Sequence, residues 1–268
     1  MTDANHTQSR CPGPGPSARR SRLARSIGLW VGLQASAGCD NTTVDLFDPD
    51  LGLVAHWALD EAQPGGTVVD ASGFSSHGTP SANPPTPSPD GPPVHFHDPY
   101  SLAFNGKDQW INLGNPGILN LGGPISIAAW VRPTAIDDYH DVVAHGYRWE
   151  PSYNLALRIF LGTYQFTYWD GTDHMASAPV PAEDVGAWVH LCGVFDGSAY
   201  RIYRNGSLVG STTSATSPPA ASSAIWAIGA RAPQNPGDAS EFLQGQIDDV
   251  RIYGRALSDA EVEAIHRR

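Results

Sequence analysis

Residues 245–261 read Gly245-Gln246-Ile247-Asp248-Asp249-Val250-Arg251-Ile252-Tyr253-Gly254-Arg255-Ala256-Leu257-Ser258-Asp259-Ala260-Glu261. The apolar residues between Ile247 and Tyr253 predict a β-strand. Residues 258–261 form a capping box, in which a serine and a glutamate side chain satisfy the free amides of a helix N-terminus. Val262 and Ile265 would then lie on one side of that helix. The stretch therefore predicts a strand followed by a short C-terminal helix.

The chain upstream of this stretch is a succession of short apolar segments separated by turn residues. Tyr153–Ile159 and Tyr164–Trp169 alternate cleanly, as half-buried strands do. Ala199–Arg204 meets Ser207–Val209 across Asn205-Gly206, a strong hairpin signal because both turn positions tolerate positive φ. The abundance of glycine (28) and proline (23) also fits short strands joined by turns. We predict an all-β fold, a two-sheet antiparallel jelly-roll sandwich with a short C-terminal helix.

The N-terminal part has the residue order of an export signal. A basic run, Arg19–Arg25, precedes the short apolar stretch Ser26–Leu33 and the small residues that end at Cys39. The apolar stretch is too short to span a bilayer as a permanent helix. Its end resembles a bacterial lipoprotein signal, which implies lipidation of Cys39. The alternative is a disordered basic tail.

These observations divide the chain into three parts. We expect residues 1–38 to be a signal or disordered basic segment, residues 39–52 a tether, and residues 53–268 the folded domain. The protein is then exported, either as a cell-envelope lipoprotein or in secreted form. Within the domain, residues 80–99 contain eight prolines and predict an irregular loop.

The charge of the chain narrows the class of partner. The formal net charge is −11, and residues 1–38 hold five of the 16 basic residues but one of the 27 acidic ones, which leaves −15 for the rest. Such a surface repels phosphate backbones, so we expect no nucleic-acid partner.

Cys192 is the single cysteine of the predicted domain. It falls in a strand pattern, which indicates a buried small residue and no disulfide within the domain.

Short motifs follow one another in order along most of the predicted domain. The motifs are Trp57-Ala58-Leu59-Asp60-Glu61, Val69-Asp70-Ala71-Ser72-Gly73, His77-Gly78, Leu102-Ala103-Phe104-Asn105-Gly106, Ile127-Ala128-Ala129-Trp130-Val131, Trp188-Val189-His190, Asp196-Gly197, Tyr203-Arg204-Asn205-Gly206 and residues 245–261. This ordered series resembles the laminin-G-like jelly-roll family of the concanavalin A-like lectin/glucanase superfamily. The resemblance implies a β-sandwich that is commonly extracellular and that often serves in adhesion or carbohydrate recognition.

Two aspartates are candidate metal ligands. If the strand is regular, Asp248 lies on the same side as Val250 and Ile252 and points toward the interior, where a charge must be paired, metal-bound or neutralised. The family resemblance implies a structural Ca²⁺ between an early loop and a late strand, with Asp70 and Asp248 as its ligands. Alternatively, Asp70 caps its own turn and Asp248 accepts backbone hydrogen bonds.

Aromatic and polar residues concentrate between residues 137 and 174. Exposed aromatic faces beside polar groups suit sugar rings, and we predict ligand binding by Tyr147, Trp149, Tyr168, Trp169 and His174. The alternative is that the aromatic residues of these strands pack in the core. The histidines in this region lack the close spacing of a transition-metal site.

No catalytic motif stands out. The chain contains no Glu-x-Asp-x-x-Glu, Gly-x-Ser-x-Gly or His-Glu-x-x-His sequence. We therefore predict a non-enzymatic, monomeric, extracytoplasmic module that binds a glycan or glycoprotein and meets the membrane only through a lipid anchor. The alternatives are a polysaccharide hydrolase of the concanavalin A-like fold and a protein-binding adhesin domain.

Overall fold

The computed structural model describes residues 48–147, 153–218, 224–231 and 239–268. Contacts between Cα atoms divide the chain into Met1–Asp45 and Leu46–Arg268. The predictions for residues 1–38, for Cys39 and for most of the 39–52 tether therefore lie outside the described residues. None of the helices in the described part has the length and apolar character needed to cross a bilayer.

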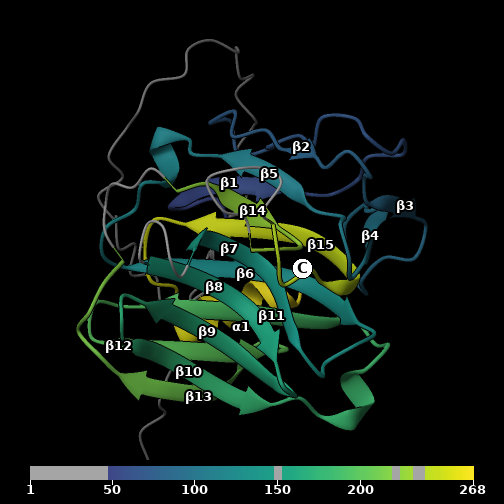
Figure 1. Ribbon diagram of the computed structural model, residues 1–268. Coiled ribbons are helices and arrows are strands. Elements are labelled where there is room, and N and C mark those ends of the chain that lie inside the picture. Colours follow the sequence, from purple (N-terminus) through teal and green to yellow (C-terminus); the bar gives the residue numbers. More distant parts are fainter. Residues whose placement is uncertain (1–47, 148–152, 219–223, 232–238) are drawn as a thin grey trace, which may run out of the picture. The chain divides into compact units, whose positions relative to one another are not determined.

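Within the described residues, the larger sheet has eight strands (Figure 1). Their order is β13-β12-β11-β6-β15-β4-β3, with β1 paired to the last residues of β15. The strands are β1 (Leu53–Trp57), β3 (Thr86–Ser88), β4 (Ser101–Asn105), β6 (Ile125–Pro133), β11 (Val189–Phe195), β12 (Ala199–Arg204), β13 (Ser207–Thr213) and β15 (Gln244–Tyr253).

The second sheet has seven strands in the described part of the chain, in the order β10-β9-β8-β7-β14-β5-β2. They are β2 (Thr79–Pro80), β5 (Ile111–Gly114), β7 (Tyr139–Tyr147), β8 (Tyr153–Phe160), β9 (Thr163–Trp169), β10 (Asp173–Pro179) and β14 (Trp226–Ile228). Neighbouring strands run antiparallel in both sheets. The predicted all-β jelly-roll sandwich is confirmed.

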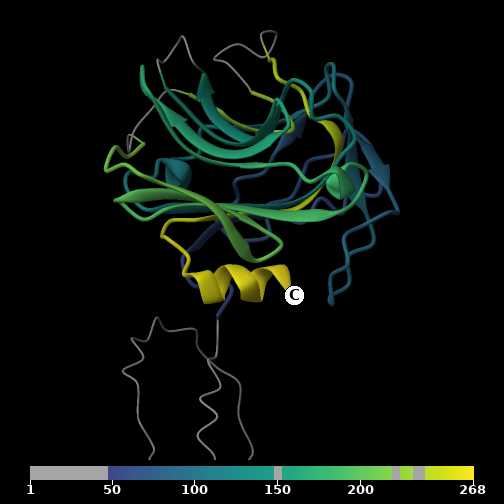
Figure 2. The same cartoon turned by 90° about the horizontal axis from the view of Figure 1, so that it is seen from below.

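The two sheets pack face to face, and helix α1 (Asp259–His266) lies against the outer side of the eight-stranded sheet (Figure 2). The outer face of the seven-stranded sheet carries no helix in this view, and its strands are curved. Two short 3-10 turns, η1 (Gly117–Leu119) and η2 (Ala182–Asp184), join strands at the rim. Apolar side chains from both sheets fill the space between them, including Trp57, Ile127, Leu157, Phe166, Phe195 and Ile228.

The local signals in the sequence are confirmed at two positions. Asn205 and Gly206 have φ values of 48° and 77° and connect β12 to β13 in a tight hairpin, as expected of a turn with positive φ at both central residues. Ser258 and Glu261 form the capping box at the start of α1. Cys192 lies buried in β11 as a free thiol.

The proline-rich segment is more ordered than an irregular loop. Residues 86–88 form β3, the edge strand that pairs with β4. Downstream of β3, the Asp90 carboxylate pairs with Arg132 of β6, and the His95 amide donates to the Arg268 carbonyl. Prolines are tolerated in edge strands, which need few ladder hydrogen bonds. The segment thus covers part of the eight-stranded sheet.

β15 departs from regular alternation. A bulge lies between Asp248 and Arg251, and Asp249 has a positive φ of 44°. Ile247 and Val250 both reach the core, which an uninterrupted strand would not allow. Asp248 pairs with Trp130 rather than with a core-facing residue of β6. The expectation that Asp248 shares the side of Val250 is therefore wrong.

Two edge strands close one side of the sandwich. β10 and β13 belong to different sheets yet lie side by side (Figure 1). Gly210 of β13 approaches the Ser177 carbonyl of β10 so closely that no Cβ would fit between them. Glycine is required here because only a residue without a side chain allows the two backbones to meet at this distance.

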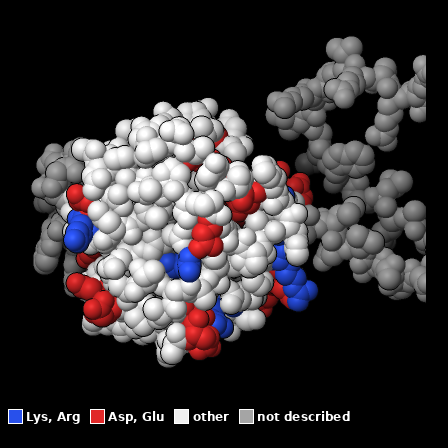
Figure 3. All heavy atoms as spheres, turned by 90° about the vertical axis from the view of Figure 1, so that its right-hand side faces the viewer, with Lys and Arg blue, Asp and Glu red and all other residues white. Residues whose placement is uncertain are grey.

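The charged side chains on one face of the molecule are spread in small groups. Figure 3 shows acidic and basic residues adjoining one another among a mostly uncharged surface. On this face the described residues form no extended basic area of the kind that a phosphate backbone requires.

Candidate ligand-binding site

Alternation along β8 and β9 separates a core face from an outer face. In β8, Leu155 and Leu157 join the core, while Asn154 and Arg158 line a pocket on the opposite side. In β9, Phe166 joins the core in the same way. Because side chains of a strand point alternately to the two faces of a sheet, the polar residues of both strands meet on the outer face.

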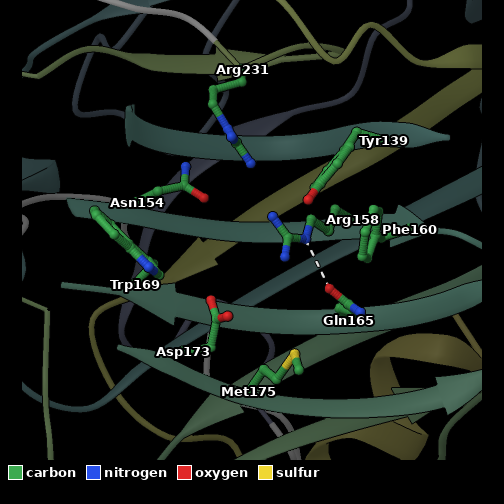
Figure 4. A pocket seen from close by; sticks show the side chains of 9 residues that line it. All are labelled: Tyr139, Asn154, Arg158, Phe160, Gln165, Trp169, Asp173, Met175 and Arg231. Carbon is green, nitrogen blue, oxygen red and sulfur yellow. Dashed lines mark hydrogen bonds between the residues drawn. The ribbon is translucent and has the colours of Figure 1, made fainter. Parts of the chain in front are cut away.

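These outer-face residues form a pocket of about 450 Å³, part of it open to solvent (Figure 4). Strands β7 to β10 supply most of the lining, and one arginine comes from the segment after β14. The pocket combines aromatic, amide, basic and acidic side chains, and polar groups placed among apolar ones are common in small-molecule sites. The lining residues are Tyr139, Asn154, Arg158, Phe160, Gln165, Trp169, Asp173, Met175 and Arg231.

Aromatic rings form one wall of the pocket. The rings of Tyr139 and Phe160 stack with centroids 3.9 Å apart at 29°. The guanidinium carbon of Arg158 lies 5.3 Å from the Tyr139 centroid and 5.5 Å from that of Phe160, within the range of a cation–π contact. These contacts hold the arginine against the wall. Trp169 lies across the pocket from them (Figure 4).

Arg158 is oriented by a neighbouring amide. Its Nε donates a hydrogen bond of 2.9 Å to Oε1 of Gln165, whose Nε2 donates in turn to Thr163 Oγ1. In Figure 4 the two terminal nitrogens of Arg158 point into the pocket between Asn154, Trp169 and Asp173. Within the described residues these two nitrogens have no hydrogen-bond partner. Their donors are therefore directed into the pocket.

A second arginine, Arg231, is held by acidic groups. Its Nη2 lies 2.5 Å from Glu241 Oε2, and its Nε lies 3.4 Å from Asp141 Oδ2. Burial, followed by the charge of Asp141, raises the pKa of Glu241 to about 8. Burial likewise raises the pKa of Asp141, although nearby Arg231 and Arg158 oppose this effect. Both carboxyls thus lie within ion-pair distance of Arg231, while burial opposes the ionisation of each.

The residues predicted to bind ligand have different positions. Trp169 lines the pocket. Tyr168 points to the opposite face, is 5% exposed and packs in the core. His174 shares that opposite face, where it stacks on Tyr168 and contacts Ser214. Trp149 lies outside the described residues, as does the side chain of Tyr147.

The structure gives the two predicted metal ligands different neighbours. The Asp70 carboxylate accepts hydrogen bonds from the backbone amides of His56, Ser72 and Ser76, at 2.8–3.0 Å. Burial would raise the pKa of Asp70, but these hydrogen bonds outweigh it and lower the pKa. Asp70 thus forms the turn cap considered as the alternative. Asp248 instead lies among other carboxylates.

Asp248 is fully buried beneath the proline-rich segment. Its Oδ1 accepts from the Asp249 amide, whereas its Oδ2 has no hydrogen-bond partner within the described residues. Burial and the nearby Asp98 carboxylate raise the pKa of Asp248 to about 10. Burial and Asp60 raise the pKa of Asp98 to about 7. Carboxylates that destabilise one another in this way favour a proton or a cation between them.

Asp249 has a different environment from its neighbour. Its Oδ1 lies 2.7 Å from His56 Nε2 and 2.9 Å from Arg251 Nη2. Burial opposes ionisation, but these partners outweigh it and hold the pKa of Asp249 far below its usual range. Across the described ranges, no three His, Cys, Asp or Glu side chains are arranged as a metal site. A cation at Asp248 would therefore need backbone oxygens as well.

The sequence comparison identifies the family. The profile described as the concanavalin A-like lectin/glucanases superfamily matches residues 105–263. The chain belongs to this superfamily. A search of the curated proteins found no similar sequence.

Solved structures share the fold at low sequence identity. Domain 4 of AbnA, a GH43 extracellular arabinanase from Geobacillus stearothermophilus in complex with arabinotriose, is 21% identical with a TM-score of 0.55. The match covers 80% of this chain and 98% of that one. The binding domain of Paraclostridial Mosquitocidal Protein 1 is 14% identical with a TM-score of 0.60, and the match covers 82% and 52%.

A third neighbour is the binding domain of botulinum neurotoxin DC in complex with SialylT. It is 11% identical with a TM-score of 0.58, over 81% of this chain and 51% of the toxin chain. The present chain therefore spans about half the length of the toxin chains that it matches. At these identities the likeness shows the fold, and the ligand must be argued from the pocket itself.

Several pocket residues were absent from the sequence prediction. Alternation around Trp169 indicates that Gln165 shares its face, and alternation in β8 pairs Asn154 with Arg158 in the same way. The aromatic pattern that predicts a sugar site does not include these amide and guanidinium side chains. Arg231 is 62 residues from Trp169, and no local pattern places it in the pocket.

Proposed function

We propose that this domain is a non-catalytic glycan-binding module whose ligand lies in the pocket on the outer face of the seven-stranded sheet. The observation that carries the proposal is the pocket lining, in which Trp169 and Tyr139 flank the donors of Arg158 and Asn154. Aromatic faces accept the C–H faces of sugars, and amide and guanidinium groups bind hydroxyls. The arabinotriose complex of the AbnA domain supports this reading by analogy.

A glycan array combined with a hydrolysis screen tests this proposal. We expect the full chain to bind at least one glycan class without cleaving it, and Trp169→Ala to weaken binding by tenfold or more. Turnover of a polysaccharide would instead identify a hydrolase of the concanavalin A-like fold. A blank array together with capture of a purified surface protein would identify a protein-binding adhesin domain. Either result rejects the proposal.

We propose that the protein acts outside the cytoplasm and is held at the envelope by a lipid on Cys39. The support is the order of basic, apolar and small residues in residues 19–39. If the anchor exists, Cys39→Ala moves the protein from the membrane fraction to the soluble fraction. Cys192→Ala is the matched control, because Cys192 is a buried thiol of the folded domain. Unchanged membrane association of Cys39→Ala rejects the anchor.

We also propose a structural Ca²⁺ at Asp248. The support is the unpartnered Oδ2 of Asp248 and the adjacent carboxylate of Asp98, since oxygen donors with negative charge suit a hard cation. Asp98 takes the place that sequence reasoning gave to Asp70. Bound there, the ion would neutralise the buried carboxylates and would take no part in chemistry.

A further inference from the structure

Two buried arginines line the pocket, whereas the carboxylates that pair with Arg231 do not. Arg158 and Arg231 are 8% and 5% exposed, and both border the cavity. Asp141 and Glu241, their acidic neighbours, are absent from the lining residues. A ligand in the pocket therefore meets the positive side of this ion-pair group.

The arrangement is directional. In Figure 4 the guanidinium group of Arg158 lies between that of Arg231 above it and the carboxylate of Asp173 below it. A negative group on the ligand would be stabilised near the arginines and repelled near Asp173, which accepts hydroxyl hydrogens instead. The ligand is thus oriented with its charged end toward β7 and β8.

The geometry of Arg158 suits a planar anion. Its Nε is occupied by Gln165, and its two terminal nitrogens are aimed into the cavity. The pair of terminal N–H groups matches the two oxygens of a carboxylate, and such charge-assisted contacts are stronger than neutral ones. Because the guanidinium is already held against Tyr139 and Phe160, little side-chain entropy is lost on binding.

We propose that the pocket selects acidic sugars and holds the sugar carboxylate on the terminal nitrogens of Arg158, beside Arg231. This proposal deepens the proposed glycan-binding function and rests on it. Trp169 then packs on the ring, and Asp173 accepts its hydroxyl groups. Neutral sugars fit the same pocket but leave the guanidinium nitrogens without an anionic partner.

Calorimetric titration of the full chain tests this selectivity with paired probes. A hexuronate trisaccharide and a sialylated trisaccharide are each compared with their methyl esters, which keep the ring and lose the charge. We expect at least one acid to bind roughly tenfold more tightly than its ester, as one charge-assisted contact provides. The affinity for the acid, but not for the ester, should fall as salt is raised.

Variants assign the effect to Arg158. Arg158→Gln should remove the preference for the acid, and Arg158→Lys, which keeps the charge and loses the fork, should retain part of it. Arg267→Gln, directly after α1, removes an equal charge from an exposed side chain and should change nothing. Melting curves show whether each variant is folded. If Arg158→Gln does not fold, the partial loss of acid preference in Arg158→Lys still tests the role of Arg158.

The outcomes separate this proposal from the proposed function. If a neutral glycan on the array binds, and acids bind no better than their esters, acid selection is rejected while glycan binding stands. If the acid preference survives in Arg158→Gln, the assignment to Arg158 is rejected. If no glycan binds at all, both proposals fail.

Discussion

Neighbouring residues in β9 have separate roles because they point to opposite faces of the sheet. Tyr168 is 5% exposed and packs in the core, whereas Trp169 lines the pocket. Composition alone treats the two as equivalent aromatic candidates. Alternation separates the residues on the two faces of a sheet. It does not say which face packs in the core and which is open to solvent, because that depends on the rest of the fold.

This difference gives a prediction for a matched pair of variants. Tyr168→Ala should lower the free energy of unfolding by about 3–5 kcal/mol, the usual cost of removing a buried aromatic ring, and leave glycan affinity unchanged in the folded fraction. Trp169→Ala should weaken glycan binding by tenfold or more with a smaller effect on stability. Urea unfolding and calorimetric titration measure the two quantities. Equal effects of both variants on both quantities would contradict the assignment.

Arg231 marks the limit of what individual residues reveal. Alternation within β9 places Gln165 on the face of Trp169, and alternation within β8 places Asn154 on the face of Arg158. Arg231 follows β14, and it reaches the pocket because β14 pairs with β7 in the same sheet. Strand order is a property of the whole fold, so local patterns do not predict such a contact.

Among the elements, β15 shows where sequence patterns are reliable and where they fail. The existence of the strand, the hairpin at Asn205-Gly206 and the helix cap at Ser258 all follow from local chemistry and are confirmed. The side of the sheet to which Asp248 points does not follow from local chemistry, because a bulge between Asp248 and Arg251 shifts the alternation. A bulge inserts an extra residue, so residues on its two sides no longer follow one alternation.

Helix α1 covers a buried histidine and should make the fold sensitive to acid. His190 of β11 lies under α1, with its ring 5.3 Å from Trp130 and 5.6 Å from His266. Burial, then His266, lowers the pKa of His190 to about 3; Asp249 opposes this effect and Arg251 adds to it. In the unfolded chain a histidine has a pKa near 6.5. As the pH falls below that value, protons bind the unfolded state first.

The expected result is a loss of stability between about pH 6.5 and pH 3, of up to about 1.4 kcal/mol per pH unit for this one group. Above pH 6.5 His190 is neutral in both the folded and the unfolded state, so its protonation no longer lowers the stability. Urea unfolding at pH 7, 6 and 5 measures the slope, which should be shallower in His190→Gln. His97→Gln replaces an exposed histidine and is the control. Identical slopes in wild type and His190→Gln would contradict this role of His190.

At the scale of the whole molecule, a cation at Asp248 would connect distant parts of the chain. Asp248 is in β15, and Asp98 is in the proline-rich segment that packs over the sheet. An ion bound only in the folded state stabilises it by RT ln(1 + [L]/Kd), about 2.7 kcal/mol at a hundredfold excess over Kd. The Tm of the purified chain should therefore rise with Ca²⁺ and fall with EDTA.

Two variants separate the predicted ligands. Asp248→Asn should abolish the Ca²⁺ dependence of Tm and leave the Tm in EDTA unchanged or higher, because it removes a buried carboxyl without a full set of partners. Asp70→Asn should lower Tm in both conditions, because it weakens a turn cap, and should keep the Ca²⁺ shift. A Tm insensitive to EDTA, with no metal found by elemental analysis, would rule out the ion.

The close approach of β10 and β13 has a consequence for self-association. An exposed edge strand is a template on which another chain can add a strand and begin a fibril. Here the edges of the two sheets meet at Gly210 and Ser177, so each partly screens the other from a passing chain. A side chain at position 210 would force the strands apart and expose both templates. Glycine at this position therefore protects the protein against aggregation as well as allowing the sandwich to close.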